Sequence, residues 1–250
     1  MNISVVIITK NEEKNISDCL KSAFLISKNV IVADSGSTDN TVAIAKEMGA
    51  DVLRVNWQGY GNTRNEGATY ALHEWILALD ADERITPLLA NEINKLQLND
   101  DAILYGFRRE SFLVKKKILY GDWGRDKVFR LYNKQKTTWD LATVHENIIT
   151  TGLKKQIIRG SILHYTMDSI ETFYNKTIHY ANLSATKYFN QQKKATVIKR
   201  FGSPLFAFIQ CYILRLGFLD GVAGFIIAKY SAFYVWKKYD LLRKMYQSVN

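Results

Sequence analysis

The first half of the chain alternates short apolar runs with stretches in which apolar residues recur every three or four positions. The apolar runs are rich in β-branched residues, as strands buried on both faces are, and the recurring spacing predicts helices. The predicted strands are 4–9, 29–33, 51–55 and 75–79, and the predicted helices between them are 15–27, 41–48 and 62–71. This alternation predicts an α/β fold built on a mostly parallel sheet flanked by helices.

Polar residues cluster where three of these predicted strands end. In a parallel sheet the carboxyl ends of the strands meet at one edge, and ligands bind there. The sequence therefore predicts a binding site at this edge. Its candidate residues are Thr9, Asn11 and Glu12 after the first strand, Asp34 and Ser35 after the second, and Asp80, Asp82 and Glu83 after the fourth.

The acidic group after the fourth strand carries the most charge. Asp80, Asp82 and Glu83 place three carboxylates within four residues at the tip of a buried strand. Such clustered charge is costly unless a cation lies beside it. Oxygen ligands favour magnesium or manganese, and an ion of this kind commonly binds a phosphate. A solvated acidic turn is the simpler alternative.

The second half of the chain predicts fewer regular elements. A helix is expected from Pro87 to about residue 98, and a second helix over 168–190. Ser203 followed by Pro204 is typical of a helix start, with Ser203 as the N-cap. Asp220-Gly221 predicts a turn before a last helix over 222–236. The expected later strands, partly antiparallel, are 103–107, 128–132 and 157–159.

The net charge of +10 is concentrated near the carboxyl end. Residues 186–250 hold eleven Lys or Arg and two Asp, a net charge of +9, against +1 for the first 185 residues. The first part is therefore an almost neutral globular domain with enough apolar residues for a sizeable core. Cys19 and Cys211 are too few for a disulfide framework or zinc site, which fits a reducing cytoplasm. The apolar run 5–8 predicts a first strand rather than a signal peptide.

The basic segment also contains two apolar stretches. The first, 204–219, includes Gln210 and Arg215 and is shorter than the ~20 apolar residues of a spanning helix. Aromatic and basic residues beside apolar helices are typical of a membrane interface, so we expect peripheral attachment to the anionic inner surface of the cytoplasmic membrane. Helices that pack on the catalytic domain, or that form a homo-oligomer interface, are the two alternatives.

Four motifs resemble family 2 glycosyltransferases with the GT-A fold, in both order and spacing. They are VVIITKNEE at 5–13, IVADSGSTDNT at 31–41, TRNEG at 63–67 and ALDADE at 78–83. The resemblance implies a GT-A catalytic domain over 1–185. Its nucleotide-binding half is 1–100 and its acceptor half 101–185, and 186–250 follows as a basic amphipathic, membrane-associating helical region.

Four further motifs resemble the lipopolysaccharide-core β-1,4-glucosyltransferase branch of that family. This finer resemblance implies a metal-dependent, inverting hexosyltransferase that moves a sugar, typically glucose, from a UDP-sugar to a lipopolysaccharide or lipooligosaccharide core acceptor. The motifs are GDWGRDKVFRLYNK at 121–134, TVHENI at 143–148, ILHYTMDSIETFYNK at 162–176 and GFLDGVAGF at 217–225.

The resemblance assigns the nucleotide to the ends of the first two strands. Thr9, Asn11 and Glu12 are placed to meet the base and ribose. Asp34 is implied to accept a hydrogen bond from the uracil imide, as an ionised carboxylate can.

The diphosphate and metal are assigned to the next two motifs. Arg64 has a planar guanidinium that can brace a diphosphate, although a surface arginine is the alternative. Asp80 and Asp82 form the DxD pair, in which the resemblance gives Asp80 the ribose and Asp82 the divalent metal, Mg or Mn. Glu83 either binds the metal or orients its ligands.

The catalytic base is expected among the carboxylates of the acceptor half. Glu146 is preferred to Asp140 and Asp126 because His145-Glu146 matches the His-Glu motif of the family. His145 is expected to hold the acceptor or the diphosphate.

Three other side chains each have two interpretations. His164 is either a further metal ligand or a histidine bonded to nearby backbone. Arg130 holds phosphate or points outward from its strand. Trp123 stacks on a sugar ring or belongs to the core.

Two rival functions follow from the same features. Enzymes that build polyprenyl-phosphate sugars resemble the amino-terminal motifs but lack the VHE region at 144–146. A nucleic-acid-binding protein is suggested by the calculated pI of 9.4. An acidic site that repels a polyanion argues against it, so we expect no nucleic acid among the partners.

Overall fold

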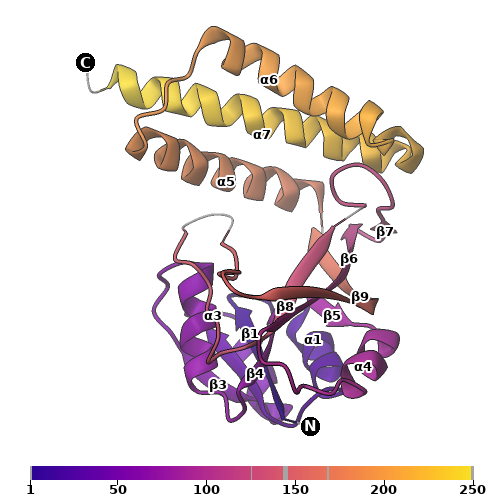
Figure 1. Cartoon of the computed structure of the whole chain (residues 1–250). Helices are drawn as coiled ribbons and strands as arrows, with labels where there is room; N and C mark the ends of the chain where they lie inside the picture. Colours follow the sequence, from indigo (N-terminus) through magenta and orange to yellow (C-terminus); the bar gives the residue numbers. More distant parts are fainter. Residues whose placement is uncertain (1, 125, 143–145, 168, 249–250) are drawn as a thin grey trace. The chain divides into compact units, whose positions relative to one another are not determined.

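The computed structural model describes residues 2–124, 126–142, 146–167 and 169–248 (Figure 1). The chain forms two compact units. Unit 1 consists of Met1–Arg109 and Lys127–His164, and unit 2 of Glu110–Asp126 and Tyr165–Asn250. The predicted division after residue 185 lies inside helix α5 (Ile170–Asn190) and stays a prediction.

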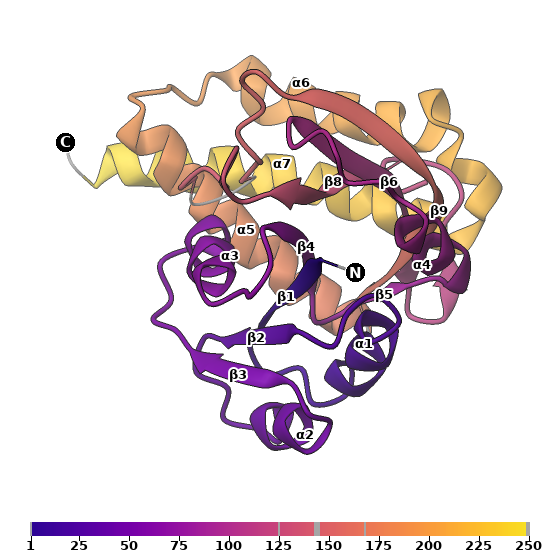
Figure 2. The ribbon, with the colours of Figure 1, turned by 60° about the horizontal axis from the view of Figure 1, so that its bottom comes forward.

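Unit 1 contains the predicted parallel sheet, in the strand order β3-β2-β1-β4 (Figure 2). Both neighbours of β1, and the β2–β3 pair, are parallel. The antiparallel strands β8, β6, β9 and β5 continue the sheet beyond β4. The strand bounds are β1 Ile3–Thr9, β2 Val30–Asp34, β3 Asp51–Arg54, β4 Trp75–Asp80, β5 Glu83–Ile85, β6 Ile103–Leu113, β8 Lys127–Asn133 and β9 Lys154–Met167.

Helices cover both faces of this sheet, as the continuous apolar strands predict. Val5 and Ile7 of β1 face a core that includes α1 (Ile16–Ala23), α2 (Thr41–Glu47) and α4 (Pro87–Asn94). Val6, between them in sequence, faces the other core with α3 (Tyr60–Thr69). Alternate residues of one strand therefore supply two cores, and the GT-A-like α/β fold predicted from the sequence is confirmed.

Unit 2 is mainly helical. α5 and α6 (Val197–Ile209) both pack on α7 (Val222–Gln247), the longest helix (Figure 1). Between α6 and α7 lie a π-helical turn, η1 (Gln210–Leu214), and a 3-10 turn, η2 (Gly217–Asp220). The predicted turn at Asp220-Gly221 is confirmed, because Gly221 has a φ of 62° and precedes the first residue of α7.

The predicted helix start at Ser203-Pro204 is wrong. α6 begins seven residues earlier, where the Thr196 hydroxyl accepts a hydrogen bond from the Lys199 N–H at 3.3 Å. Pro204 lies inside the helix and is buried. A proline forfeits one helical hydrogen bond there. The cap at Thr196 and the packing of α6 on α7 outweigh that cost.

Two motifs of the finer resemblance contribute to one set of contacts inside unit 2. The buried carboxylate of Asp220 accepts hydrogen bonds from the N–H groups of Leu119 and Tyr120, the latter at 2.8 Å. Arg215 forms an ion pair with Asp122, and its carbonyl accepts the Gly121 N–H at 2.9 Å. These motifs therefore hold the 119–122 loop against the turns η1 and η2, which is a structural role.

Candidate functional site

The register of the parallel strands brings the predicted site residues together. Thr9 pairs with Asp34 across β1 and β2, and Ile8 pairs with Asp80 across β1 and β4. The ends of three strands therefore lie side by side at the carboxyl edge of unit 1. β1 is also the point at which the chain order reverses in the sheet, where α/β folds form their ligand crevices.

A buried network of ion pairs is the centre of this edge. Arg64 is 1 % exposed and donates from Nη2 to Asp80 Oδ1 at 2.5 Å and from Nη1 to Glu146 Oε1 at 2.6 Å. Arg130 of β8, also buried, donates from Nη2 to the other oxygen of Asp80 at 3.1 Å. The structure thus places Arg64, Asp80, Arg130 and Glu146 in one cluster, although they are up to 82 residues apart in sequence.

The charges in this cluster stabilise one another. Burial disfavours the carboxylate of Asp80, but the guanidinium groups of Arg130 and Arg64 outweigh that effect and hold its pKa well below the ordinary range. Burial by itself would lower the pKa of Arg130. The carboxylates of Asp80, Glu83 and Glu146 outweigh this effect, so the pKa of Arg130 is raised above its ordinary value. Both groups are therefore ionised at any physiological pH.

Trp139 supports both arginines and was not predicted. Its ring lies 4.5 Å from the guanidinium carbon of Arg64 and 5.3 Å from that of Arg130. Its Nε1–H donates to the hydroxyl of Tyr132 at 3.2 Å, and the indole is 5 % exposed. The sequence shows only a tryptophan seven residues before Glu146. No spacing in the sequence links this tryptophan to Arg64 on α3 or to Arg130 on β8.

The motif TRNEG acts largely by holding other segments of unit 1. The side chain of Asn65 donates to the carbonyl of Trp139 at 2.9 Å and accepts from its N–H at 2.9 Å. A Cβ on Gly61 would lie 2.0 Å from the carbonyl oxygen of Asp140, and one on Gly67 would lie 2.6 Å from Val6. Both glycines therefore permit close approach. α3 is clamped between β1 and the segment that leads to Glu146.

Asp82 and His164 form a second, smaller pair. The Nε2 of His164 lies 3.5 Å from Asp82 Oδ2, and the two side chains are 14 % and 13 % exposed. Burial opposes a charge on His164, but the carboxylate of Asp82 outweighs this and raises its pKa. Glu83, fully buried, accepts the N–H of Asp80 at 3.0 Å and so orders the acidic turn.

The first two loops are hydrogen-bonded to each other. The Oδ1 of Asn11 accepts the N–H of Thr38 at 2.8 Å, and the N–H of Glu12 donates to the hydroxyl of Thr41 at 2.8 Å. Asn11 has a φ of 56°, a left-handed conformation that asparagine tolerates. Asp34 accepts hydrogen bonds from the N–H groups of Gly36 and Ser37, both at 3.0 Å. These bonds order the rim of the site.

Several buried polar atoms at this edge lack a hydrogen-bond partner. Within the described part of unit 1, every such side-chain atom belongs to a residue of the predicted site. Buried polar groups of folded proteins are normally satisfied, so a cluster of unsatisfied ones calls for an ordered water, an ion or a ligand. The atoms are Thr9 Oγ1, Arg64 Nε, Glu83 Oε1, Arg130 Nη1 and His164 Nδ1.

Other predicted residues are not part of this cluster. His145 lies outside the described residues. Trp123 and Asp126 belong to unit 2, where the ring of Trp123 packs 5.3 Å from that of Phe173. Asp140 uses Oδ1 to accept the N–H of Ala142 at 3.1 Å, which closes a turn. Among the residues that the structure describes, no three His, Cys, Asp or Glu side chains are grouped to hold a metal ion.

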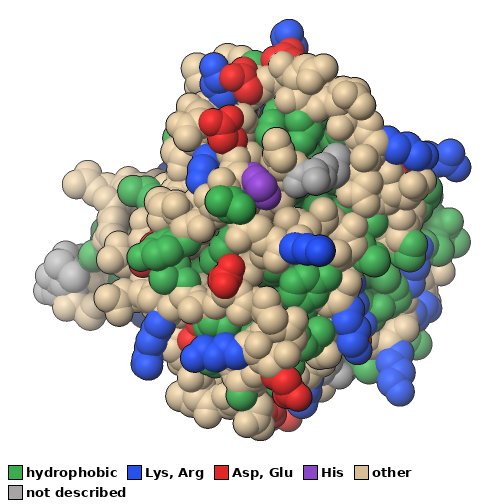
Figure 3. Space-filling view, turned by 90° about the horizontal axis from the view of Figure 1, so that it is seen from below, with side chains coloured by type: hydrophobic (Ala, Val, Ile, Leu, Met, Phe, Trp, Pro, Cys, Tyr) green, Lys and Arg blue, Asp and Glu red, His purple; other side chains and the backbone are tan. Residues whose placement is uncertain are grey.

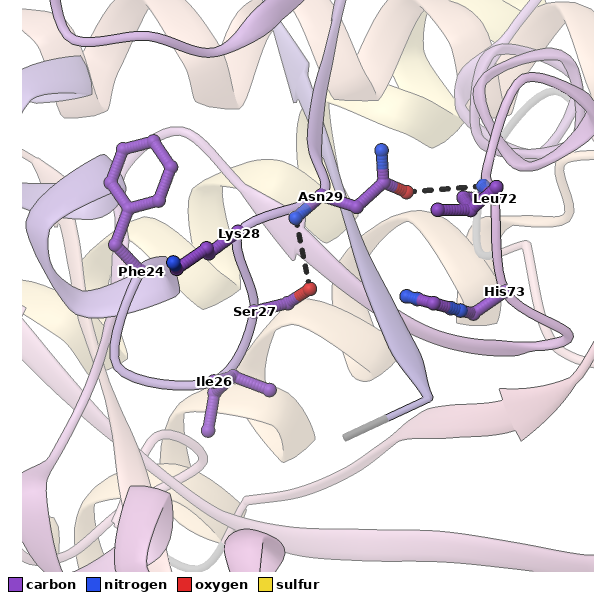
Figure 4. A pocket seen from close by; sticks show the side chains of 7 residues that line it. All are labelled: Phe24, Ile26, Ser27, Lys28, Asn29, Leu72 and His73. Carbon is purple, nitrogen blue, oxygen red and sulfur yellow. Dashed lines mark hydrogen bonds between the residues drawn. The ribbon is translucent and has the colours of Figure 1, made fainter.

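A separate depression lies where β2 and β4 begin (Figure 4). It is bordered by segments 24–29 and 72–73, and Asn29 spans it by accepting the Leu72 N–H at 3.1 Å. The face of the molecule that is seen from below in Figure 3 has acidic and basic side chains scattered among apolar ones. The depression has no cluster of ionised groups, so the functional site is assigned to the carboxyl edge of the strands.

Comparison with known proteins gives a consistent picture. Residues 4–156 match the family model for glycosyl transferase family 2. An uncharacterized glycosyltransferase of Rickettsia prowazekii is 31 % identical over 92 % of this chain and 83 % of its own length. The lipopolysaccharide core biosynthesis glycosyltransferase LpsC of Rhizobium meliloti is 28 % identical over 94 % of this chain and 89 % of its own length.

Solved structures with related folds are more distant. Staphylococcus aureus TarS 1–349 in complex with UDP-GlcNAc covers 99 % of this chain and 92 % of its own, at 15 % identity and a TM-score of 0.48. Glucosyl-3-phosphoglycerate synthase of Mycobacterium tuberculosis, in complex with Mn²⁺ and UDP-glucose, covers 44 % of this chain and 43 % of its own, at 25 % identity and a TM-score of 0.37. These likenesses add nothing about substrates.

Proposed function

Because this chain belongs to glycosyl transferase family 2, we propose that it is an inverting hexosyltransferase that uses a UDP-sugar. The donor sugar is glucose in this proposal, and the acceptor is a lipopolysaccharide or lipooligosaccharide core. The relative LpsC, a lipopolysaccharide core biosynthesis glycosyltransferase aligned over most of both chains, supports this acceptor class. The enzyme then works in the cytoplasm at the inner face of the membrane, where a growing glycolipid presents its core.

One observation carries the proposal: the unsatisfied buried polar atoms of unit 1 are gathered at the carboxyl edge of its sheet. Two buried guanidinium groups and a hydroxyl present N–H and O–H donors there. A sugar nucleotide supplies acceptors of the matching kind, because its diphosphate carries several anionic oxygens.

The nucleoside is assigned to the ends of β1 and β2. Thr9, Asn11 and Glu12 lie at this rim. The Thr9 hydroxyl has no hydrogen-bond partner among the described residues. Asp34 already accepts hydrogen bonds from the N–H groups of Gly36 and Ser37 and from the Ser37 hydroxyl. The hydroxyl can rotate away, so an imide N–H of uracil can take its place on the carboxylate.

Arg64 and Arg130 are assigned to the diphosphate. Each is held by Asp80, and Arg64 is also held by Glu146. When diphosphate oxygens compete for Arg64, the carboxylate of Glu146 is released from its 2.6 Å ion pair. Glu146 can then accept the proton of the acceptor hydroxyl, which is the role of the general base. His145 is assigned to the same step, beside the acceptor.

A divalent metal, Mg or Mn, is expected beside Asp82. The carboxylate of Asp82 is a ligand type that suits such an ion. Nε2 of His164 lies 3.5 Å from it, and both side chains are partly accessible. When bound, the ion stabilises negative charge on the departing diphosphate as a Lewis acid. Asp82 and His164 would hold it.

The test is transfer from radiolabelled UDP-glucose to truncated lipopolysaccharide, with and without manganese and then with chelator. We expect transfer with inversion, seen as a β-linkage by NMR, and no transfer to polyprenyl phosphate. Transfer to the polyprenyl acceptor alone would assign the rival function. Asp82→Asn should lower kcat by about 10³-fold and abolish the response to added metal. Asp18→Asn, at an exposed acid of α1, is the matched control.

A further inference from the structure

An exposed apolar face on α6 is not explained by the proposed chemistry. Ile198, Phe201 and Leu205 are spaced by three and four residues, so they form one stripe, and they are 81 %, 58 % and 63 % exposed. Phe206 lies beside this stripe, and Leu214 continues the exposed apolar surface into η1. These residues form the surface that we name the α6 face.

The opposite side of α6 is fixed against α7. Arg200 donates to Asp240 at 3.0 Å, Pro204 is buried, and the rings of Phe208 and Phe225 lie 6.0 Å apart. These contacts set the rotation of α6 within unit 2. The α6 face is therefore its outward side.

The exposed charged residues of 186–250 carry one sign of charge. The only acidic residues of 186–250 are Asp220 and Asp240, and both are buried and hydrogen-bonded inside unit 2. Lys194 and Lys199 are exposed, and neither has an acidic partner among the described residues. The surface thus combines large apolar side chains with unneutralised positive charge.

We propose that the α6 face docks on an anionic lipid bilayer, with α6 lying in the plane of the membrane surface. The apolar stripe enters the acyl boundary and the lysines contact anionic headgroups. Amphipathic helices at membrane surfaces bind in this way. A second copy of this chain is the less favourable occupant, because it would bring two positively charged rims together. The proposal rests on the proposed function only in that a glycolipid acceptor lies in the same surface.

An in-plane arrangement fits better than a membrane span. By length and composition, Val197–Leu214 is a candidate span among the described residues, with a mean hydropathy of 1.2 and 11 % of its residues buried. Its 18 residues would reach about 27 Å, short of the ~30 Å hydrocarbon core. A span would also carry Lys199 and the Arg200–Asp240 pair into lipid, which is costly.

The test is cosedimentation of the full chain with phosphatidylglycerol-containing vesicles and with phosphatidylcholine vesicles. We expect binding to the anionic vesicles that weakens as salt is added. Phe201→Glu with Leu205→Glu should lower the partition coefficient at least tenfold. Tyr70→Glu with Leu72→Glu, at residues 63 % and 76 % exposed in unit 1, should leave it unchanged. Far-UV circular dichroism and unchanged unfolding midpoints establish that both variants fold.

The charge requirement is tested separately. Lys194→Glu with Lys199→Glu should reduce binding to anionic vesicles by about the same factor, whereas Lys28→Glu with Lys46→Glu, also at exposed lysines, should not. Equal binding to both kinds of vesicle, no binding, or binding unaffected by the α6 substitutions would overturn the proposal. A concentration-dependent dimer abolished by Phe201→Glu would assign the face to self-association. UDP binding, measured by calorimetry, reports on the proposed function independently.

Discussion

The two units handle polarity in opposite ways. At the carboxyl edge of the unit 1 sheet, several charged groups are buried, and some of their polar atoms have no hydrogen-bond partner among the described residues. In residues 186–250 of unit 2, both acids are buried and hydrogen-bonded while large apolar side chains of α6 are exposed. Each arrangement is costly alone, and each becomes favourable with a different ligand: an anionic sugar nucleotide for unit 1 and a lipid surface for unit 2. In this proposal unit 1 carries out the chemistry, and unit 2 attaches the protein to the membrane.

Arg64 offers the largest test of the unit 1 half of this comparison. Arg64→Ala removes the partner of both Asp80 and Glu146, so two carboxylates that are only 25 % and 15 % exposed lose their nearest cation. We expect kcat/KM to fall by at least about 10³-fold and the free energy of unfolding to fall by about 3–5 kcal/mol. Steady-state kinetics and urea unfolding measure the two effects. Arg54→Ala, at an exposed arginine of β3, is the control, and similar losses there would contradict the assignment.

Asp80 links stability to pH. Its folded-state pKa is depressed, so its stabilising contribution is present above the unfolded value of about 4 and is lost as pH falls toward the folded value. We expect Asp80→Asn to lower the free energy of unfolding by about 3 kcal/mol between pH 5 and pH 8. The difference from the unsubstituted protein should shrink below about pH 4. A difference that stays constant from pH 7 to pH 3 would rule out this linkage.

Replacing one glycine in each unit by alanine compares how tightly the two units are packed at those positions. Gly61→Ala in α3 places a Cβ 2.0 Å from the Asp140 carbonyl oxygen, so the segment leading to Glu146 must shift. We expect a 10- to 100-fold loss in kcat/KM and a loss of about 1–3 kcal/mol in stability. Gly202→Ala in α6 meets only Ile198 at 3.7 Å and should stabilise unit 2 by about 0.5–1 kcal/mol. Equal effects would show that α3 is not clamped.

Trp139→Phe is expected to have a small effect on both stability and activity. Trp139→Phe keeps an aromatic ring under both guanidinium groups but removes the 3.2 Å hydrogen bond to Tyr132, whose burial raises its pKa to about 12. We expect a loss of about 1 kcal/mol in stability and less than a tenfold change in kcat/KM. Trp139→Ala should cost several times more, because the stacking surface is also lost. Equal losses of stability in the two variants would show that the hydrogen bond to Tyr132, and not the stacking surface, is what Trp139 contributes.

The parallel half of the fold could be predicted because its signals are local. Each strand is an uninterrupted apolar run and each ends in polar residues, so residues 3–9 and 75–80 were found to within a residue or two. β9 was harder, since the predicted strand 157–159 is a small part of a 14-residue strand that carries exposed lysines. The start of α6 was missed because Ser203-Pro204 has the local form of a helix cap, whereas Thr196 performs that role.

The candidate site was predicted in its residue types but not in its pairings. Arg64 and Asp80 were expected to face a ligand, yet in the structure they bind each other. Asn65 was part of a motif without an assigned contact, and it holds the backbone of Trp139. These pairings join segments up to 82 residues apart, and hydrogen bonds over such separations leave no periodic signal along one chain.

The sequence by itself determined the alternation of strands and helices, the acidic turn at the end of β4 and the concentration of positive charge near the carboxyl end. Only the tertiary structure decided that Arg64 joins Asp80 to Glu146, that Trp139 lies under two arginines, and that the acids of 186–250 are buried while the α6 face is exposed. The reason is physical. Local patterns reflect backbone geometry and burial, whereas the energy of a buried charge depends on which distant groups the fold brings within a few ångströms.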